Sequence, residues 1–349
     1  MAKAKKKNKK EEPVADSLSE IKKDIIRQYG NVISKVSDHE DMAVPTVSTG
    51  SISLDAALGR GGMALGRVYE VYGPNSGGKS TLAASVVKEA QKRGMRCCYV
   101  DAEHAVDPLL FKNYGVDVEA LDLIQAYNGE ENLDILEKYI QSGVFSVAVV
   151  DSVSSLIPSA EAEAAIGDDH IALLARLMSK ALRRLTPITN RAGCLLIFIN
   201  QLRMKIGTYG NPETTTGGEA LNFYTTGRIY VRGPESKARR IIGPNGDVIG
   251  HRTEFEIIKN KLSAPFKKAE INLIYGKGYD IHWEVLKLGS DFGVIEQSRS
   301  WYKYNDTNLA NGEMNAVAFL KENPEIYNEI REEVIALAQV KEFYEQHSR

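Results

Sequence analysis

Cysteine is scarce in this chain of 349 residues, which contains only Cys97, Cys98 and Cys194. An odd, sparse set without metal-ligand spacing excludes a disulfide framework and a cysteine-based metal site, and it favours a reducing compartment. Long apolar runs are missing as well, because a stretch such as Leu195–Ile199 is far shorter than the roughly 20 residues that span a bilayer. No apolar core follows the Lys-rich start, so that start does not read as a secretory signal. We therefore expect a cytoplasmic protein without a membrane segment.

Charge of one sign is not in excess, because 44 Lys and Arg stand against 46 Asp and Glu, a net charge of −2. A site for a polyanion must therefore be a local patch rather than a property of the whole surface. Residues 1–12 are the exception, with six Lys and two Glu. We predict a disordered Lys-rich arm over residues 1–15. It is interpreted as a solvated tail, and attraction of phosphates is the alternative.

A short helix is predicted from Ser17 to Tyr29. Ser17-x-x-Glu20 matches a capping box, and Gly30 stands where a helix ends. Apolar residues at helical spacing form one stripe: Leu18, Ile21, Ile25 and Tyr29. Because so short a helix is not stable alone in water, the stripe must dock, either on the chain's own core or on a neighbouring subunit. Residues 16–44 are assigned to this helix and a linker.

Strand and helix patterns alternate from about residue 45. Short apolar runs predict four strands, at Arg67–Tyr72, Arg96–Val100, Val144–Val150 and Cys194–Ile199, and a helix over 79–93. This pattern indicates an α/β fold with a mostly parallel sheet covered by helices on both faces. Ligands of such sheets bind at the carboxyl ends of the strands. We therefore expect the functional residues directly after each strand.

The pattern changes to alternating strands and hairpins from about residue 228, with a turn predicted at Asn245-Gly246. Beyond residue 280 a smaller α/β unit is predicted. Its last helix carries one apolar stripe: Ile326, Ile330, Val334 and Leu337. The predicted organisation is a core at residues 45–278 and a small C-terminal α/β domain at residues 279–349.

The segment after the first strand matches a phosphate-binding loop. Gly73-Pro74-Asn75-Ser76-Gly77-Gly78-Lys79-Ser80 has the form G-x-x-x-x-G-K-[ST] and lies between a predicted strand and a predicted helix. Glycines let backbone N–H groups surround phosphate oxygens, and the helix N-terminus adds a positive dipole end. Lys79 would reach the terminal phosphates, and the hydroxyl of Ser80 would bind Mg²⁺. ATP and Mg²⁺ are the cofactors that we infer.

Carboxylates end two other strands. Asp151 ends an apolar strand in the Walker B pattern, where a carboxylate holds Mg²⁺ through water, so the predicted metal ligands are Ser80 and Asp151. Glu103 follows the second strand and is our candidate for the base that orients the attacking water, with Asp101 as the alternative. His104 is interpreted as a packed or surface histidine.

Gln201 ends the fourth strand, and its amide can respond to a γ-phosphate. The segment Leu202–Gly218 that follows combines Arg203, Lys205, four glycines and three consecutive threonines. Cations and hydroxyls on a flexible backbone suit phosphate contacts, and Ile206 would act as a wedge between bases. A structureless loop of 17 residues is uncommon unless it is functional, so we predict a nucleic-acid-binding loop, with an ordinary mobile loop as the alternative.

These residues together resemble the RecA family of bacterial DNA recombinases. The resemblance runs from about Val47 to Gly278 and continues more weakly to about residue 335. Its most specific stretches are Gly73–Thr81, Asp101–Pro108, Val149–Ser152, Asn200–Gly218 and Lys259–Phe266. It implies a RecA-type P-loop ATPase core whose DNA-binding loops lie at about residues 161–172 and 202–218. It also implies a DNA-dependent ATPase that forms helical filaments on single-stranded DNA, exchanges strands with homologous double-stranded DNA and promotes self-cleavage of SOS-type repressors.

The family's functional residues carry over onto matching positions. The resemblance implies that Lys79 and Glu103 are catalytic, that Gln201 relays the γ-phosphate state to the second DNA loop, and that Lys259 and Lys261 reach a neighbouring subunit's ATP. The implied ATP-binding residues are Gly73, Pro74, Asn75, Ser76, Gly77, Gly78, Lys79, Ser80, Thr81, Asp107, Asp151 and Tyr275, with Asp107 and Tyr275 on the adenine side. The implied DNA-binding residues are Ser179, Arg183, Arg203, Met204, Lys205, Ile206, Gly207, Thr214, Thr216, Gly217 and Gly218. Phe223 would be a subunit contact, and the helix at residues 17–29 would dock on the adjacent subunit.

The chain departs from the family's pattern at several positions. Leu110 replaces a tyrosine that stacks on adenine, and Glu219 replaces an asparagine beside the DNA. Glu254 and Glu256 stand where basic residues often serve a second DNA strand, and the inserted Lys237-Ala238-Arg239-Arg240 would restore that charge. Two other functions stay open, a ring-shaped motor of the helicase type and a DNA-binding accessory protein with a weakened ATPase.

Overall fold

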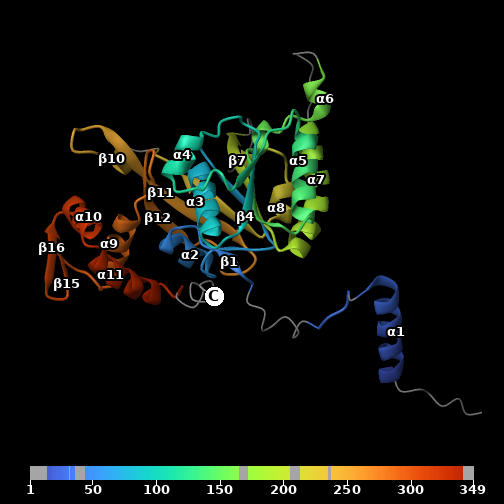
Figure 1. Cartoon of the computed structure of the whole chain (residues 1–349), viewed down its shortest axis with the longest axis horizontal. Helices are drawn as coiled ribbons and strands as arrows, with labels where there is room; N and C mark the ends of the chain where they lie inside the picture. Colours follow the sequence, from blue (N-terminus) through green and yellow to red (C-terminus); the bar gives the residue numbers. More distant parts are fainter. Residues whose placement is uncertain are drawn as a thin grey trace, which may run out of the picture. The chain divides into compact units, whose positions relative to one another are not determined.

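The computed structural model describes residues 14–30, 32–35, 44–164, 172–204, 213–234 and 237–340. It divides the chain into two units, Met1–Val44 and Pro45–Arg349, which we describe separately (Figure 1). Of the arm predicted over residues 1–15, residues 1–13 lie outside the described part. Val14 and Ala15 belong to a helix, so the prediction is wrong for these two residues.

The first unit contains one helix, α1 (Val14–Tyr29), within its described residues. The predicted helix is therefore present, and it ends as expected before Gly30, which has φ 79°. It begins at Val14, so Ser17 lies inside the helix and the predicted capping box is wrong.

The second unit is built on a large sheet, with two small separate sheets, one of two strands (β1-β2) and one of three. Its strands are β1 (Thr46–Val47), β2 (Met63–Ala64), β3 (Val68–Gly73), β4 (Arg96–Asp101), β5 (Leu121–Ile124), β6 (Phe145–Asp151), β7 (Leu195–Met204), β8 (Glu213–Thr215), β9 (Gly227–Arg232), β10 (Arg240–Ile242), β11 (Val248–Asn260), β12 (Lys268–Ile274), β13 (Gly278–Tyr279), β14 (Glu296–Ser298), β15 (Trp301–Tyr304) and β16 (Thr307–Asn311). Its α-helices are α2 (Ile52–Leu58), α3 (Lys79–Lys92), α4 (Pro108–Asn113), α5 (Gly129–Gln141), α6 (Ser159–Ala162), α7 (Leu173–Ala192), α8 (Ala220–Tyr224), α9 (Ile281–Asp291), α10 (Glu313–Glu322) and α11 (Pro324–Leu337).

The main path of the large sheet has the strand order β13-β12-β11-β9-β3-β7-β6-β4-β5. The six strands from β9 to β5 pair in parallel, and β11, β12 and β13 extend the sheet in antiparallel fashion. All four predicted strands and the helix after the phosphate-binding loop are confirmed. The prediction of a mostly parallel α/β sheet followed by antiparallel strands is therefore correct.

Helices cover both faces of the parallel strands. Alternate strand residues, such as Ala148 and Val150, pack in one cluster with apolar residues of α5, α7 and α8. Because neighbouring side chains of a strand point to opposite faces, Val147 and Val149 face the other side. On that side Tyr99 of β4 contacts Phe111 of α4 edge to face, with ring centroids 5.4 Å apart. The carboxyl ends of these strands are left between the two helical layers.

The segment predicted as a structureless loop, Leu202–Gly218, is partly a β-ribbon. Strand β7 continues to Met204, and Leu202 and Arg203 pair antiparallel with Thr215 and Thr214 of β8. The prediction of a structureless loop is wrong for the two ends of this segment, which are paired. The β-branched threonines there favour the paired, extended conformation. Residues 205–212 lie outside the described part of the chain. The predicted Asn245-Gly246 turn is confirmed, since it joins β10 to β11 and Gly246 has φ 83°.

A three-stranded sheet, β14-β15-β16, and helices α9, α10 and α11 form a second core toward the C-terminus. Ile330 and Val334 of the predicted stripe are buried there, but Leu337 is 52% exposed, so that part of the stripe is wrong. Leu337 is the last residue of α11, and Val340 beyond the helix fills the core instead. Ile52 of α2 also packs in this second core, so an N-terminal helix of the second unit contacts the C-terminal helices and strands.

Candidate nucleotide and DNA site

The phosphate-binding loop joins β3 to α3 and needs glycine for its shape. Gly78 has φ 102° and precedes the first helical residue, Lys79. The backbone conformation therefore requires glycine, and a side chain at Gly78 would also come within 2.7 Å of Cδ1 of Leu273, which would have to shift. Lys79 Nζ donates to the carbonyl oxygens of Gly73 (3.2 Å) and Pro74 (2.7 Å). Burial lowers the pKa of Lys79, and the charges of two nearby carboxylates oppose that effect.

Asp151 lies at the end of β6, beside this loop, and is 8% exposed. The hydroxyl of Tyr99 donates to Asp151 Oδ2 at 2.7 Å, and the side chain of Ser80 also hydrogen-bonds to this carboxylate. Burial raises the pKa of Asp151, whereas these two hydrogen bonds lower it. A hydroxyl and a carboxylate are oxygen ligands of the kind Mg²⁺ prefers. Ser80 and Asp151 would therefore hold the metal, and the residues present fit a magnesium nucleotide.

The two candidate bases have different surroundings. Asp101 is 2% exposed, and its carboxylate accepts from the N–H groups of Ala105 and Val106 (both 3.1 Å) and from Gln125 Nε2 (2.9 Å). These bonds fix the turn after β4, so the carboxylate of Asp101 has a structural role. Glu103 is exposed on the same turn and lies close enough to Lys79 to act on its charge. The geometry favours Glu103 as the base, and this assignment stays a prediction.

Gln201 lies between Glu103 and the segment Leu202–Gly218. Its Nε2 donates to Glu103 Oε1 at 3.1 Å, and Leu202, the next residue, begins the pairing with β8. Asn200, one residue earlier, is fully buried and donates from Nδ2 to Glu70 Oε1 and to the carbonyl oxygen of Thr216, each at 2.9 Å. Both ends of the segment Leu202–Gly218, the predicted second DNA loop, are therefore anchored to the sheet next to the phosphate-binding loop.

The predicted DNA-binding residues fall into two groups. Ser179, Arg183, Arg203, Thr214, Thr216, Gly217 and Gly218 lie in the described part, whereas Lys205, Ile206, Gly207 and the side chain of Met204 lie outside it, as do residues 165–171 of the first loop. Gly217 has φ 86°, and a side chain there would come within 2.9 Å of Val153 and 3.2 Å of Met178. The end of the predicted second DNA loop thus packs against α7 at Met178, which precedes Ser179. Arg183 is exposed and hydrogen-bonds within α7, from Nε to the carbonyl oxygen of Ser179 at 3.2 Å.

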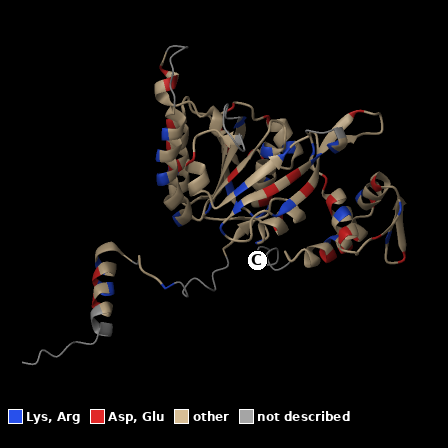
Figure 2. Cartoon of the chain, turned by 180° about the vertical axis from the view of Figure 1, so that it is seen from behind, with Lys and Arg blue, Asp and Glu red and all other residues tan. Residues whose placement is uncertain are grey.

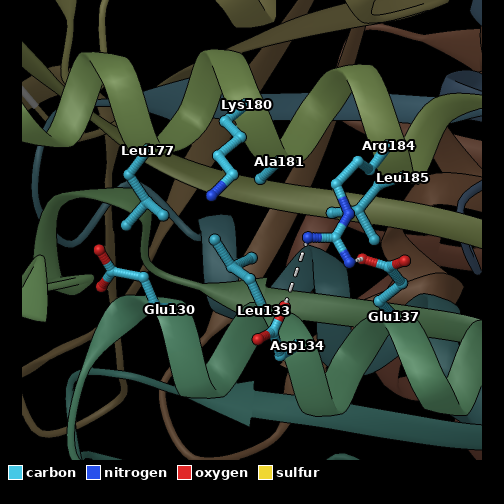
Figure 3. Close-up of a pocket in the computed structure, with 9 residues that line it drawn as sticks. All are labelled: Glu130, Leu133, Asp134, Glu137, Leu177, Lys180, Ala181, Arg184 and Leu185. Carbon is cyan, nitrogen blue, oxygen red and sulfur yellow. Dashed lines mark ion pairs between the residues drawn. The ribbon is translucent and has the colours of Figure 1, made fainter.

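The neighbouring face of α7 is used to hold α5. Figure 3 shows Arg184 reaching across to Asp134 and Glu137 of α5, at 3.8 Å and 2.7 Å. Leu133, Leu177 and Leu185 line the pocket of about 80 Å³ between the two helices. Arg184 therefore forms ion pairs between α7 and α5, whereas its neighbour Arg183 bonds within α7.

The two residues predicted to lie on the adenine side, Asp107 and Tyr275, have different hydrogen-bond partners within the protein. Asp107 caps α4, because its Oδ1 accepts from the backbone N–H of Leu109 at 2.8 Å. Tyr275 follows β12, and its hydroxyl lies 3.2 Å from Nδ1 of His251. Thr253, two residues along β11, hydrogen-bonds through Oγ1 to the carbonyl oxygen of Gly77 at 3.4 Å. These bonds connect Tyr275's neighbours on β11 to the phosphate-binding loop.

Phe111 is 5% exposed and packed against Tyr99, so it does not substitute for the tyrosine that Leu110 replaces.

Lys259 and Lys261 lie together at the end of β11. Lys259 Nζ donates to the carbonyl oxygens of Asn222 and Phe223, and Lys261 Nζ donates to that of Phe223 at 3.4 Å. Burial lowers the pKa of Lys259, and the charges of Lys261 and Arg228 lower it further. Phe223 itself is 72% exposed. The two lysines therefore lie beside Phe223, the residue predicted to contact a neighbouring subunit, and that role stays a prediction.

The glutamates at the predicted second DNA site are neutralised within the chain. Glu254 pairs with Arg232, Arg239 and Lys268, each at 3.2 Å, and Glu256 pairs with Arg232 at 3.0 Å. In Figure 2 basic and acidic residues are interleaved on these strands. Arg239 belongs to the inserted stretch, so the insertion supplies compensating charge. The two carboxylates form part of an ion cluster and do not stand as an isolated negative patch.

Sequence reasoning missed several residues that hold the site together: Glu70, Tyr99, Ser152, Arg228, His251 and Thr253. Tyr99 had one usable signal, a hydroxyl in an otherwise apolar strand next to the Walker B strand. Glu70 is a carboxylate buried in β3 and pairs with Arg228 Nε at 2.5 Å. Arg228 is 158 residues further along the chain, so no local pattern links the two.

The fold and these residues define the class first: a P-loop ATPase with a mostly parallel sheet and a small C-terminal domain. Family models then match most of the chain, with the RecA N-terminal domain at residues 14–280 and the RecA C-terminal domain at residues 283–339. The chain therefore belongs to the RecA family, and the resemblance seen in the sequence is confirmed.

Known relatives agree. Protein RecA of Pseudomonas putida is 44% identical over 93% of this chain and 90% of its own length. Protein RecA of Wigglesworthia glossinidia brevipalpis is 45% identical over 94% of this chain and 97% of its own length. Protein RecA of Marinobacter nauticus is 46% identical over 91% of this chain and 90% of its own length.

No helix in the described ranges is both long and apolar enough to cross a membrane.

Proposed function

We propose that this chain is a DNA-dependent ATPase that assembles on single-stranded DNA as a helical filament and pairs it with homologous double-stranded DNA. Membership of the RecA family supports the proposal as a whole. The observation that carries it within this chain is the hydrogen bond from Gln201 to Glu103. It joins the first residue before the DNA segment to the carboxylate beside the phosphate-binding loop, so that one side chain can sense both ligands.

Each part of the site has a role in this proposal. Residues 73–81 bind the phosphates of ATP, Ser80 and Asp151 hold Mg²⁺, and Asp107 and Tyr275 contact the adenine side. Mg²⁺ supplies charge stabilisation to the transferring phosphoryl group when it is bound. Glu103 accepts a proton from the attacking water and orients it, while Lys79 stabilises the negative charge that develops.

The partner subunit completes the site. Lys259 and Lys261 would reach the neighbour's nucleotide, as an arginine finger does, and their position next to the exposed Phe223 supports this. The α1 stripe would dock on the adjacent subunit, since Leu18, Ile21 and Tyr29 are more than half exposed (53%, 55% and 64%). The proposal keeps an ATPase core at residues 45–278 and a C-terminal domain at residues 279–349. A cytoplasmic location and action on SOS-type repressors are part of the same proposal by family analogy.

A binding assay with a fluorescent single-stranded oligonucleotide tests this function. We expect tight binding with Mg²⁺ and a non-hydrolysable ATP analogue, and much weaker binding with ADP or without nucleotide. Lys259→Ala combined with Lys261→Ala should remove this nucleotide dependence and leave nucleotide binding to the single chain intact. Equal DNA affinity in all nucleotide states would contradict the proposal. Strand exchange and electron microscopy follow, and closed rings without filaments would favour a motor of the helicase type instead.

A further inference from the structure

The hydrogen bonds of Glu103 are unevenly divided between its two oxygens. Within the part of the chain that the structure describes, both go to Oε1, from Ser152 Oγ at 2.6 Å and from Gln201 Nε2 at 3.1 Å. Oε2 is left to accept from a water. An exposed glutamate has several rotatable bonds, and a catalytic group displaced by about 1 Å loses much of its effect. The base therefore needs a fixed partner.

Ser152 has the properties of that fixed partner. It follows Asp151 at the end of β6 and is fully buried. Its bond to Glu103, at 2.6 Å, has the short length of a hydroxyl bound to an ionised carboxylate, which is a strong type of hydrogen bond. Gln201 is only half-buried, and its bond is 0.5 Å longer in accord with a neutral amide donor. One of the two donors is thus buried with a short bond, and the other is partly exposed with a longer one.

The neighbouring groups set the direction of this bond. A serine has one hydroxyl proton and an ionised carboxylate can only accept, so Ser152 donates to Glu103. Ser154 Oγ lies 2.7 Å from Ser152 Oγ and must then donate to it, which turns the Ser152 proton toward Glu103. The backbone N–H of Ala102 also donates to the carbonyl oxygen of Asp151 at 2.8 Å. The segments that carry Glu103 and Ser152 are therefore joined twice.

We propose that Ser152 is a positioning residue that holds Glu103 toward the attacking water, while Gln201 exchanges between Glu103 and the terminal phosphate. The proposal rests on the proposed function, because that function gives Glu103 the role of base. When Gln201 turns to the phosphate, Ser152 keeps Oε1 engaged, so the carboxylate stays in place. The departure of Gln201 also returns a lone pair to Glu103, which makes the carboxylate a better acceptor once nucleotide and DNA are bound.

Ser152→Ala tests the positioning role through a split between kcat and KM. We expect kcat of DNA-stimulated ATP hydrolysis to fall by about 10- to 100-fold, as for a displaced catalytic group. KM for ATP should stay the same, because the hydroxyl of Ser152 bonds to Glu103 and to neighbouring serines and not to the phosphate-binding loop. Ser155→Ala is the matched control, since Ser155 lies in the same turn and has no bond to Glu103. Ser152→Cys keeps the volume and a weak donor and should recover part of kcat.

Two outcomes separate this inference from the proposed function. An active wild type whose kcat is unchanged by Ser152→Ala overturns the role of Ser152 and leaves the function standing. A wild type without DNA-stimulated hydrolysis overturns the function. Thermal unfolding of Ser152→Ala, Glu103→Ala and the double variant needs no turnover: non-additive midpoints support the contact, and additive midpoints overturn the proposal. Should the Ala variant not fold, Ser152→Cys carries both measurements.

Discussion

The carboxylates after β4 and at the end of β6 differ from those on β11 in the partners that hold them. Glu103 and Asp151 accept from the neutral donors Ser152, Gln201 and Tyr99. Glu254 and Glu256 are paired with arginines and a lysine, as described above. Neutral donors position a carboxylate and leave its charge available for a metal ion or a water. Cations cancel that charge, so the ion cluster on β11 serves structure.

Glu103→Gln and Glu254→Gln form the sharpest test of this comparison and carry the largest expected effect. Loss of a positioned general base lowers the rate by about 10²–10⁴, so Glu103→Gln should reduce DNA-stimulated ATP hydrolysis by that factor and leave ATP binding unchanged. Glu254→Gln should leave the rate unchanged. Steady-state hydrolysis with saturating single-stranded DNA gives the comparison, and equal losses in both variants would break it.

Glu284 is a third case in this comparison. Its donors are neutral, as at Glu103 and Asp151, but both of its carboxylate oxygens accept hydrogen bonds from the protein. Oε1 accepts from Ser51 Oγ (2.5 Å), Ser53 N (3.0 Å) and Ser53 Oγ (2.6 Å), and Oε2 accepts from Ile52 N (3.2 Å). Glu284 thereby connects α9 to the start of α2. Glu284→Ala leaves these donors unpaired and should cost about 3 kcal/mol in the free energy of unfolding, measured in urea. The exposed Glu296→Ala is the control, and equal stabilities would show that this carboxylate holds nothing.

Tyr99→Phe removes one neutral donor from Asp151 and keeps the ring. Loss of a partner that orients a metal ligand typically weakens metal affinity by about tenfold or more, so the Mg²⁺ concentration for half-maximal hydrolysis should rise by about tenfold. Tyr279→Phe is the matched control, since its hydroxyl is buried without a hydrogen-bond partner in the described chain. A Mg²⁺ titration that does not distinguish the two variants would refute the role of Tyr99.

Arg239→Ala should have the smallest effect, about 0.5–1 kcal/mol in the free energy of unfolding, as for a partly exposed ion pair. Burial raises the pKa of Glu254, but the hydrogen bond from Lys268 and the charges of Lys268, Arg239 and Arg232 lower it overall. A lowered pKa means that the ion cluster stabilises the folded chain fully above the ordinary value of 4.5 and loses this effect as the pH falls below it. The difference between wild type and variant should therefore vanish in acid and shrink in high salt. A difference that persists in acid would contradict the electrostatic origin.

Local patterns were sufficient for much of the site. The phosphate-binding loop, the strand that ends in Asp151 and the turn that carries Glu103 all follow from neighbouring residues in the sequence, because each combines a strand with the residues directly after it. The same reasoning failed where distant strands decide the outcome. Arg203 and Thr214 pair across a ribbon that no local period announces, and Leu337 is exposed because Val340 fills the core in its place.

The sequence by itself determined the sheet, the phosphate-binding loop and the family of this protein, since apolar period and glycine spacing act over a few residues. Only the tertiary structure decided which carboxylates are paired with cations and which accept from neutral donors. Ser152 and Glu103 are 49 residues apart, and Arg239 lies in a short 3-10 helix before β10 whereas Glu254 lies on β11. Hydrogen bonds and ion pairs act over about 3 Å in space and are indifferent to separation along the chain. The partners of each carboxylate were therefore fixed by the fold.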